Sequence, residues 1–132
     1  MSEVDAKAAR PLSPHLQIYK PILTMVTSIL HRITGSALYV GTVLVAWWLI
    51  AIASGPAYYD FVSEIFGSIL GRLVLFGFTW ALTFHMIGGM RHLVWDTGRG
   101  LEKGTREKLA LATVIGSVVL TILLWIIGYA VR

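Results

Sequence analysis

Three long runs without a charged residue constrain this chain more than any other feature. They cover residues 33–54, 73–90 and 109–131. A hydrocarbon core of about 30 Å needs roughly 20 helical residues to cross it, and none of the runs alternates polar and apolar residues as a barrel strand does. With 56% hydrophobic and 14% charged residues, the chain is too apolar for an ordinary soluble domain. We therefore predict an all-α integral membrane protein with three transmembrane helices in a lipid bilayer.

Proline and glycine residues indicate where the expected helices begin and end. Residues 1–21 form an amino-terminal arm, and residues 22–132 form the membrane domain, with spans at about 24–54, 66–94 and 108–131. Regular helix begins after Pro21, with Thr24 or Thr27 as a candidate cap. The pair Gly55-Pro56 ends the first span and opens a connection. Gly67 and Gly71 form a small-residue pattern that would let another helix approach closely.

The positive charges predict the orientation. Basic residues lie before or at the start of the first run and again in the second connection, whereas residues 55–64 contain none; they are Lys7, Arg10, Lys20 and Arg32, then Arg91, Arg99, Lys103, Arg106 and Lys108. By the positive-inside rule, the amino terminus and the second connection are cytoplasmic and the carboxyl terminus is outside. The net charge of +4 thus reflects membrane orientation, and we expect no nucleic-acid partner.

The composition of the amino-terminal arm indicates which kind of membrane the chain occupies. It has no apolar segment of the signal-peptide kind, and Glu3 and Asp5 argue against an organellar transit peptide. We expect a bacterial cytoplasmic membrane in preference to the mitochondrial inner membrane.

Some chemistry is excluded from this chain. It contains no cysteine, so it has no disulfide and no thiolate ligand for zinc or an iron–sulfur cluster. The sequence Gly98-Arg99-Gly100 follows a helix, not a strand, and lacks the context of a dinucleotide site. Any flavin, iron–sulfur or nucleotide chemistry must belong to another subunit.

One imidazole stands alone in the second run. His85 is the only strongly polar side chain among residues 73–90. On a helix it shares a face with Gly88, Gly89 and His92. An iron ligand beside glycines, which leave room for a flat macrocycle, suits haem. The alternative is a histidine hydrogen-bonded to a neighbouring helix, with the glycines serving only close packing. Because ionisable residues inside a membrane are costly, they mark function by default, without naming which function.

A second polar cluster opens the first run. Ser28, His31 and Arg32 are spaced so that they can face one pocket near the membrane surface. A hydroxyl, an imidazole and a guanidinium together suit a polar ring or an acidic group. The alternative is that Arg32 only extends to lipid head groups while Ser28 helps to cap the helix.

These segments resemble a known family. Residues 10–16 (RPLSPHL), 28–35 (SILHRITG) and 85–96 (HMIGGMRHLVWD) are similar to the cytochrome b subunit of succinate dehydrogenase, the larger membrane anchor of complex II. The likeness covers nearly the whole chain. It implies that His85 is an axial ligand of haem b, that Ser28 and Arg32 line the ubiquinone site, that His31 and His92 lie near the haem propionates, and that Asp96 lies near the quinone pocket.

The resemblance also implies partners. These are a second membrane anchor subunit and the iron–sulfur and flavoprotein subunits, which would oxidise succinate. Two ligands on opposite sides of one iron cannot come from one helix face, so His92 cannot join His85 as a ligand. His15 and His31 are expected nearer the membrane surface. The partner anchor must then supply the second axial ligand.

Three functions remain open on the residues alone. The first is a haem- and quinone-binding anchor, in which Arg32 polarises a quinone oxygen, Ser28 bonds to it and Asp96 helps to supply protons. The second is a small transporter subunit with His85 as a proton relay. The third is a passive membrane adaptor without haem.

Overall fold

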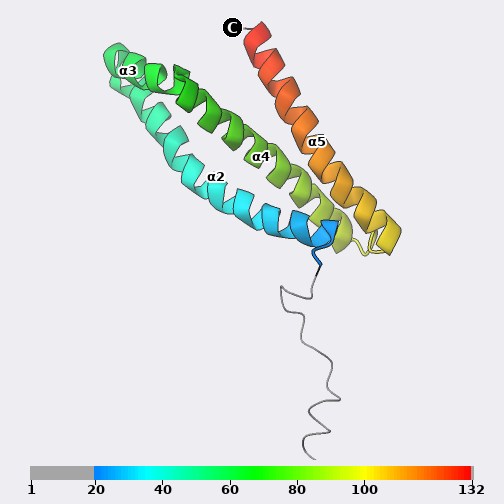
Figure 1. Cartoon of the computed structure of the whole chain (residues 1–132). Helices are drawn as coiled ribbons and strands as arrows, with labels where there is room; N and C mark the ends of the chain where they lie inside the picture. The colour runs from blue at the N-terminus through cyan, green and yellow to red at the C-terminus, as the bar shows by residue number, and fades with distance from the viewer. Residues whose placement is uncertain (1–19, 132) are drawn as a thin grey trace, which may run out of the picture.

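The computed structural model describes residues 20–131, and all of the regular structure within them is helical. The helices are α2 (Leu23–Ser54), α3 (Pro56–Gly67), α4 (Ile69–Asp96) and α5 (Lys103–Ala130), as Figure 1 shows. Three of them, α2, α4 and α5, are long and apolar enough to cross a membrane. The predicted all-α fold with three transmembrane helices is therefore confirmed. Most of the expected amino-terminal arm, including residues 10–16 and His15, lies outside the described residues.

The long helices run alternately up and down. The start of α2, the end of α4 and the start of α5 meet at one end, while α3 and the end of α5 lie at the other (Figure 1). We call the first of these the basic end, because it carries most of the described cations: Lys20, Arg32, Arg91, Arg99, Lys103, Arg106 and Lys108. Residues 33–71 contain no lysine or arginine, and Arg72 near the start of α4 is the one cation of the α3 end within residues 20–131. The fold thus keeps the charge asymmetry on which the predicted orientation depends.

The amino-terminal end of α2 has no side-chain cap. Ile22 occupies the N-cap position and the helix begins at Leu23. The expected cap at Thr24 or Thr27 was wrong, since both residues lie inside the helix. There the Thr27 hydroxyl donates to the carbonyl oxygen of Thr24 at 3.1 Å, which leaves the threonine oxygen free to accept a bond from another helix.

The connection expected after Gly55 is itself a helix. Gly55 has φ 108°, a conformation that favours glycine, and Pro56 follows in the first turn of α3, where a missing N–H costs nothing. Trp47 Nε1 of α2 donates to Tyr58 Oη of α3 at 2.8 Å, which ties the short helix back onto α2. Ser68 then caps α4 by accepting from Gly71 N at 3.1 Å.

Of the small-residue pattern Gly67 and Gly71, one glycine allows close packing between the end of α3 and the start of α4. Gly71 is buried, and a Cβ added there would collide with the carbonyl oxygen of Ile65 and the backbone of Phe66. Gly67, by contrast, is exposed and a Cβ would meet nothing within 4 Å. The close approach that we expected from a separate helix is made at Gly71 by the end of α3.

Polar side chains join α4 to α5 in the middle of the molecule. Thr83 Oγ1 lies 2.9 Å from Thr121 Oγ1 and donates to the carbonyl oxygen of Ser117 at 3.2 Å. All three residues are buried. Because lipid tails are as apolar as leucine, transmembrane helices associate through such hydrogen bonds and through small residues that allow close packing.

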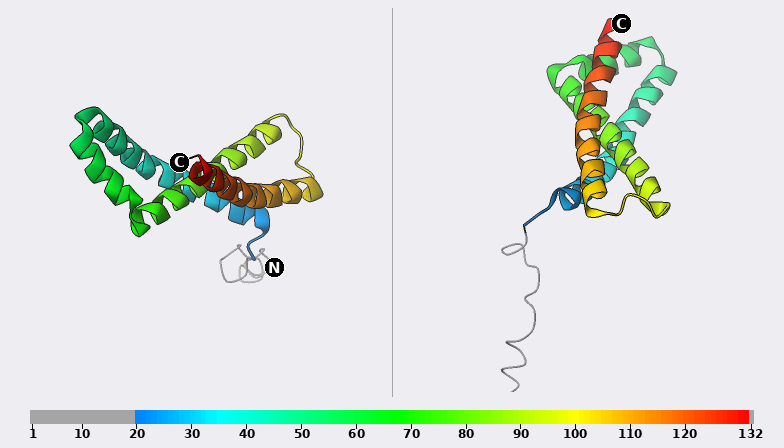
Figure 2. Two further views of the ribbon diagram at one scale, coloured as in Figure 1. Left: turned by 90° about the horizontal axis from the view of Figure 1, so that it is seen from above. Right: turned by 90° about the vertical axis from the view of Figure 1, so that its right-hand side faces the viewer.

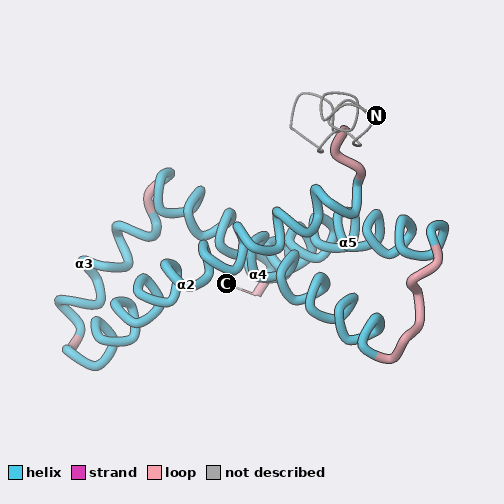
Figure 3. The backbone as a smooth tube through the Cα atoms, turned by 90° about the horizontal axis from the view of Figure 1, so that it is seen from below, coloured by secondary structure: helices cyan, strands magenta, loops and turns pink. Residues whose placement is uncertain are grey.

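α2 and α4 cross, and their contacts extend from the Thr27–Arg91 pair to the Gly41–Phe78 pair. Seen from above, the two helices form an open cross (Figure 2, left), and the same crossing is seen from below (Figure 3). α2 buries only Thr27, Thr34, Gly41 and Ala51. Most large apolar side chains of α2, α4 and α5 are exposed, which suits helices that face lipid or another subunit.

Candidate functional site

Two imidazoles meet where α2 and α4 cross near the basic end. The rings of His31 and His85 are stacked, with centroids 3.9 Å apart and planes 17° from parallel. Each ring bonds to the backbone of the other helix: His85 Nδ1 lies 3.1 Å from the His31 carbonyl oxygen, and His31 Nε2 lies 3.2 Å from the His85 carbonyl oxygen. A carbonyl oxygen only accepts, so each of these nitrogens carries the proton. In neutral His85, Nε2 therefore keeps a lone pair.

Two glycines make this pairing possible. A Cβ on Gly35 of α2 would lie 2.9 Å from His85 Cε1, and a Cβ on Gly88 of α4 would collide with the His31 ring. Each histidine thus lies against a glycine of the opposite helix. A Cβ on Gly89 would meet nothing within 4 Å. The space that we expected beside Gly88 is filled by His31, whereas the space beside Gly89 is open.

The pairing corrects the depth expected for His31. We expected it nearer the membrane surface than His85, because Arg32 follows it directly. Stacked rings lie at the same depth, and the crossing of α2 over α4 brings them there. Residues of a helix are 100° apart around its axis, so His31 can face α4 while Arg32 faces outward.

Arg91 is buried beside this pair. Only 3% of its surface is exposed. Its Nη1 donates to Thr27 Oγ1 of α2 at 2.9 Å, and its guanidinium carbon lies 5.0 Å from the centre of the Trp95 ring. Its Nε is buried and has no hydrogen-bond partner among residues 20–131. Burial of a cation whose contacts are a hydroxyl and an aromatic face is costly.

We did not predict Arg91 as a site residue, since from the sequence it only marked the end of a span. A pattern on α2 could have revealed it. Thr27, His31 and Thr34 recur at i, i+4 and i+7, which is a polar stripe on one face of an apolar helix. Such a stripe indicates polar partners on the facing helix.

The third histidine joins the group. The His92 ring lies edge-on to His31, with centroids 5.2 Å apart, and edge-on to Trp95 at 5.2 Å. We call His31, His85, Arg91 and His92 the polar cluster. The structure brings together the three histidines singled out from the sequence, and adds the arginine.

The remaining predicted site residues lie outside this cluster. Ser28 and Arg32 are exposed and share a flank of α2 next to the face that meets α4. Asp96 is exposed at the end of α4. Within residues 20–131 no three His, Asp or Glu side chains converge as ligands for a metal ion. The chain can offer one imidazole nitrogen to a metal that is held mainly by other groups.

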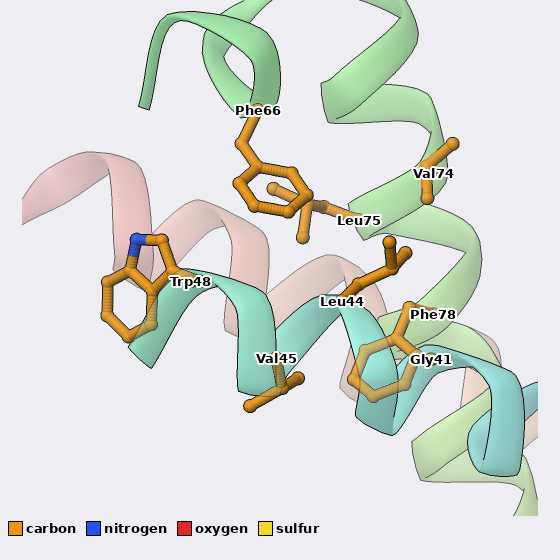
Figure 4. A pocket seen from close by; sticks show the side chains of 8 residues that line it. All are labelled: Gly41, Leu44, Val45, Trp48, Phe66, Val74, Leu75 and Phe78. Carbon is orange, nitrogen blue, oxygen red and sulfur yellow. The ribbon is translucent and has the colours of Figure 1, made fainter. Parts of the chain in front are cut away.

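An apolar cavity of about 350 Å³ lies elsewhere, between α2, α3 and α4. Figure 4 shows its lining, in which Phe78 lies against Gly41. The lining residues are Gly41, Leu44, Val45, Trp48, Phe66, Val74, Leu75 and Phe78. Gly41 is ten residues from His31, about 15 Å along the helix at 1.5 Å per residue. The cavity is therefore separate from the polar cluster.

Comparison with known proteins places the sequence in a family. Residues 6–124 match the family described as succinate dehydrogenase/fumarate reductase transmembrane subunit. The chain is 44% identical over 129 residues to the succinate dehydrogenase cytochrome b556 subunit of Paracoccus denitrificans, covering 98% of both chains. It is 39% identical over 117 residues to the same subunit of Rickettsia prowazekii, covering 89% of this chain and 91% of that one.

A mitochondrial relative is more distant. The succinate dehydrogenase cytochrome b560 subunit of Bos taurus is 35% identical over 108 residues, which cover 80% of this chain and 64% of the bovine one. The resemblance noted in the three segments thus extends over almost the full length of bacterial proteins. The chain belongs to the succinate dehydrogenase/fumarate reductase transmembrane subunit family.

Proposed function

We propose that this chain is a membrane anchor of a succinate:quinone oxidoreductase, that it ligates haem b through His85, and that it forms part of the ubiquinone site. One observation carries the haem assignment. The bond from His85 Nδ1 to the His31 carbonyl oxygen, 3.1 Å long, sets the tautomer in which Nε2 is unprotonated. Histidines that ligate metals in proteins almost always donate their other ring N–H to a carbonyl, a carboxylate or water in this way.

The residues around His85 fit a haem. Ligation uses the ring edge, so the stacking of His31 on the ring face does not block it. Gly89 leaves open space one turn from His85. When bound, haem accepts and releases one electron at a time. His31 and Thr34 hold the ligand ring in place, since Thr34 Oγ1 also lies 3.4 Å from His85 Nδ1.

Residues 20–131 offer no second axial ligand, so we propose that a partner anchor subunit supplies it. Parallel rings stacked 3.9 Å apart cannot direct their nitrogens at one iron from opposite sides, which rules out His31 as the other ligand. His92 shares a helix face with His85 and is ruled out for the same reason. A second anchor subunit is therefore required, and the exposed apolar faces of the helices are suited to receive it.

Ser28 and Arg32 are the proposed quinone ligands. Both are exposed at the basic end, where a quinone bound between subunits could reach them. The Ser28 hydroxyl would donate to a quinone oxygen, and the guanidinium of Arg32 would polarise it. Asp96 ends α4 at the same end of the molecule, and its carboxylate would help to supply the protons that quinone reduction consumes.

We propose that the redox centres that oxidise succinate belong to partner subunits. A chain without cysteine holds no iron–sulfur cluster on thiolates, so iron–sulfur and flavoprotein subunits would oxidise succinate and pass electrons on. We propose that they dock at the basic end, on the cytoplasmic side of a bacterial membrane. The distribution of lysine and arginine and the bacterial relatives support this placement.

A difference spectrum tests the proposal. The complex is purified with its partners in mild detergent, and its spectrum is recorded reduced minus oxidised. We expect a low-spin b-type haem that is lost together with this subunit. A complex without haem would contradict the proposal and favour a small transporter, in which His85 relays protons, or a passive adaptor.

A further inference from the structure

The cavity between α2, α3 and α4 has a lining that suits hydrocarbon. Among the side chains that line it, only the Trp48 indole carries a polar atom. A water molecule in a protein needs two to four polar partners, so an apolar cavity excludes water and accepts apolar molecules. Two of the lining side chains, Val45 of α2 and Val74 of α4, are exposed. A molecule in the surrounding lipid can therefore enter the cavity.

The size of the cavity suits a chain of carbon atoms. A cavity of about 150 Å³ holds the six carbons of benzene, so one of about 350 Å³ holds about 14 carbons at the same density. The lining extends along α2 from Gly41 to Trp48, which are seven residues or about 10 Å apart along the helix axis. A space with this volume and length accommodates most of one acyl chain.

The α3 end of the cavity lies at the depth of the lipid head groups. Four large aromatic side chains gather where α2 meets α3, and Trp47 Nε1 donates to Tyr58 Oη there at 2.8 Å; the others are Trp48 and Tyr59. Tryptophan and tyrosine collect at the membrane–water interface because one part of each ring system is apolar and another is polar. From this level the cavity runs toward Gly41 and thus into the hydrocarbon core, which is the direction of an acyl chain below its head group.

A basic side chain lies at the same end. Arg72 is exposed one turn before Leu75, which lines the cavity, and about 60° from it around α4. Side chains of a helix lean toward its amino terminus, which for α4 is the α3 end. The acids of α3 lie elsewhere: Asp60 and Glu64 are each two positions from the fully buried Val62, so they are on the opposite, exposed face. A guanidinium in this position is complementary to a phosphate.

We propose that this cavity binds one acyl chain of an anionic phospholipid, and that Arg72 binds the phosphate of the same lipid. In the proposed orientation the lipid belongs to the outer leaflet. The chain fills the space between α2 and α4 on the α3 side of their crossing (Figure 4). The proposal goes beyond the proposed function, because neither haem nor quinone takes part in it.

Photolabelling of the whole complex tests the proposal. The complex is purified with its partners and incubated with vesicles of phosphatidylglycerol that carries a diazirine in its acyl chain. Detergent washing removes loosely held lipid before irradiation, and mass spectrometry locates the labelled residues. We expect the label to concentrate on the cavity lining, around Val45 and Val74. Equal labelling of all exposed helix faces, or a cavity without label because a partner subunit covers it, would overturn the proposal.

A larger side chain in the cavity should exclude the acyl chain. Leu44 lines the cavity, and Leu44→Trp should reduce its labelling severalfold. Leu49→Trp is the matched control, because Leu49 is exposed on the same helix outside the lining, and its labelling should equal that of the wild type. If Leu44→Trp does not assemble, Leu75→Trp fills the cavity from α4, with the exposed Leu73→Trp as its control. Equal labelling in a filled variant and its control would overturn the proposal.

The position of the phosphate is tested at Arg72. One basic side chain near an anionic lipid surface corresponds to about fivefold in affinity, so Arg72→Gln should reduce the label that survives washing about fivefold. Arg72→Lys should keep it, because lysine also extends a positive charge to the head groups. Unchanged label in Arg72→Gln would overturn the assignment of the phosphate to Arg72. The subunit composition of each purified variant is the control for assembly.

Discussion

Gly35→Ala places a methyl group at the closest approach between α2 and the proposed haem ligand. The added Cβ would lie 2.9 Å from His85 Cε1 and 3.5 Å from His85 Nδ1. Carbon atoms pack best at about 3.5–4.0 Å, so the imidazole must withdraw by at least about 0.6 Å. One face of the imidazole is covered by the stacked His31 ring, which limits how the imidazole can turn.

The withdrawal breaks a bond that orients the ligand. His85 Nδ1 lies 3.1 Å from the His31 carbonyl oxygen, and a further 0.6 Å or so takes this pair out of hydrogen-bond range. A lost hydrogen bond costs about 0.5–1.5 kcal/mol. If that bond orients the ring for ligation, haem affinity falls roughly 2- to 13-fold.

Haem content at limiting haem supply measures the loss. The purified complex is assayed for haem per flavin and for its low-spin absorption. Gly77→Ala is the matched control, because Gly77 is also inside a transmembrane helix but a Cβ there meets nothing within 4 Å. Both variants gain the same helix propensity, so only the contact differs. Haem content and spectrum in Gly35→Ala equal to those of Gly77→Ala would refute the role of this contact.

Four further substitutions test the haem ligand, the quinone site and the contact between α4 and α5. His85→Leu keeps apolar bulk but removes the nitrogen, so it should abolish the low-spin haem spectrum while succinate oxidation by a soluble acceptor survives; an unaltered spectrum would mean that His85 is not the ligand. Ser28→Ala should weaken quinone turnover per haem about 2- to 13-fold, and Arg32→Lys should weaken it further because the planar donors are lost. Wild-type kinetics in both, across a quinone titration, would place the pocket elsewhere. Thr83→Val removes the hydroxyl that bonds to Thr121 and Ser117. It should lower the stability of the complex by about 0.6 kcal/mol per bond. An unchanged thermal unfolding transition would show that these bonds contribute nothing.

The helices and their order could be predicted because hydropathy is a local property. Each uncharged run is long enough to cross a bilayer, and within a membrane a segment of this kind can satisfy its backbone only as a helix. His85 was identifiable for a similar reason, since one imidazole in an apolar run is conspicuous whatever surrounds it. The helical character of α3 was missed, because a stretch with a proline, two tyrosines and two acids has no clear period to read.

The partners of the polar side chains depend on how far each helix is rotated and where two helices cross, which no periodicity specifies. His31 and Arg32 are neighbours in the chain, yet one stacks on His85 while the other is exposed. Arg91 was read from the sequence as a charge at the end of a span, but the crossing of α2 over α4 places Thr27 against it and buries it. Local hydropathy thus determines which segments are membrane-spanning helices, whereas the hydrogen bonds between α2 and α4 in the polar cluster join residues more than fifty positions apart.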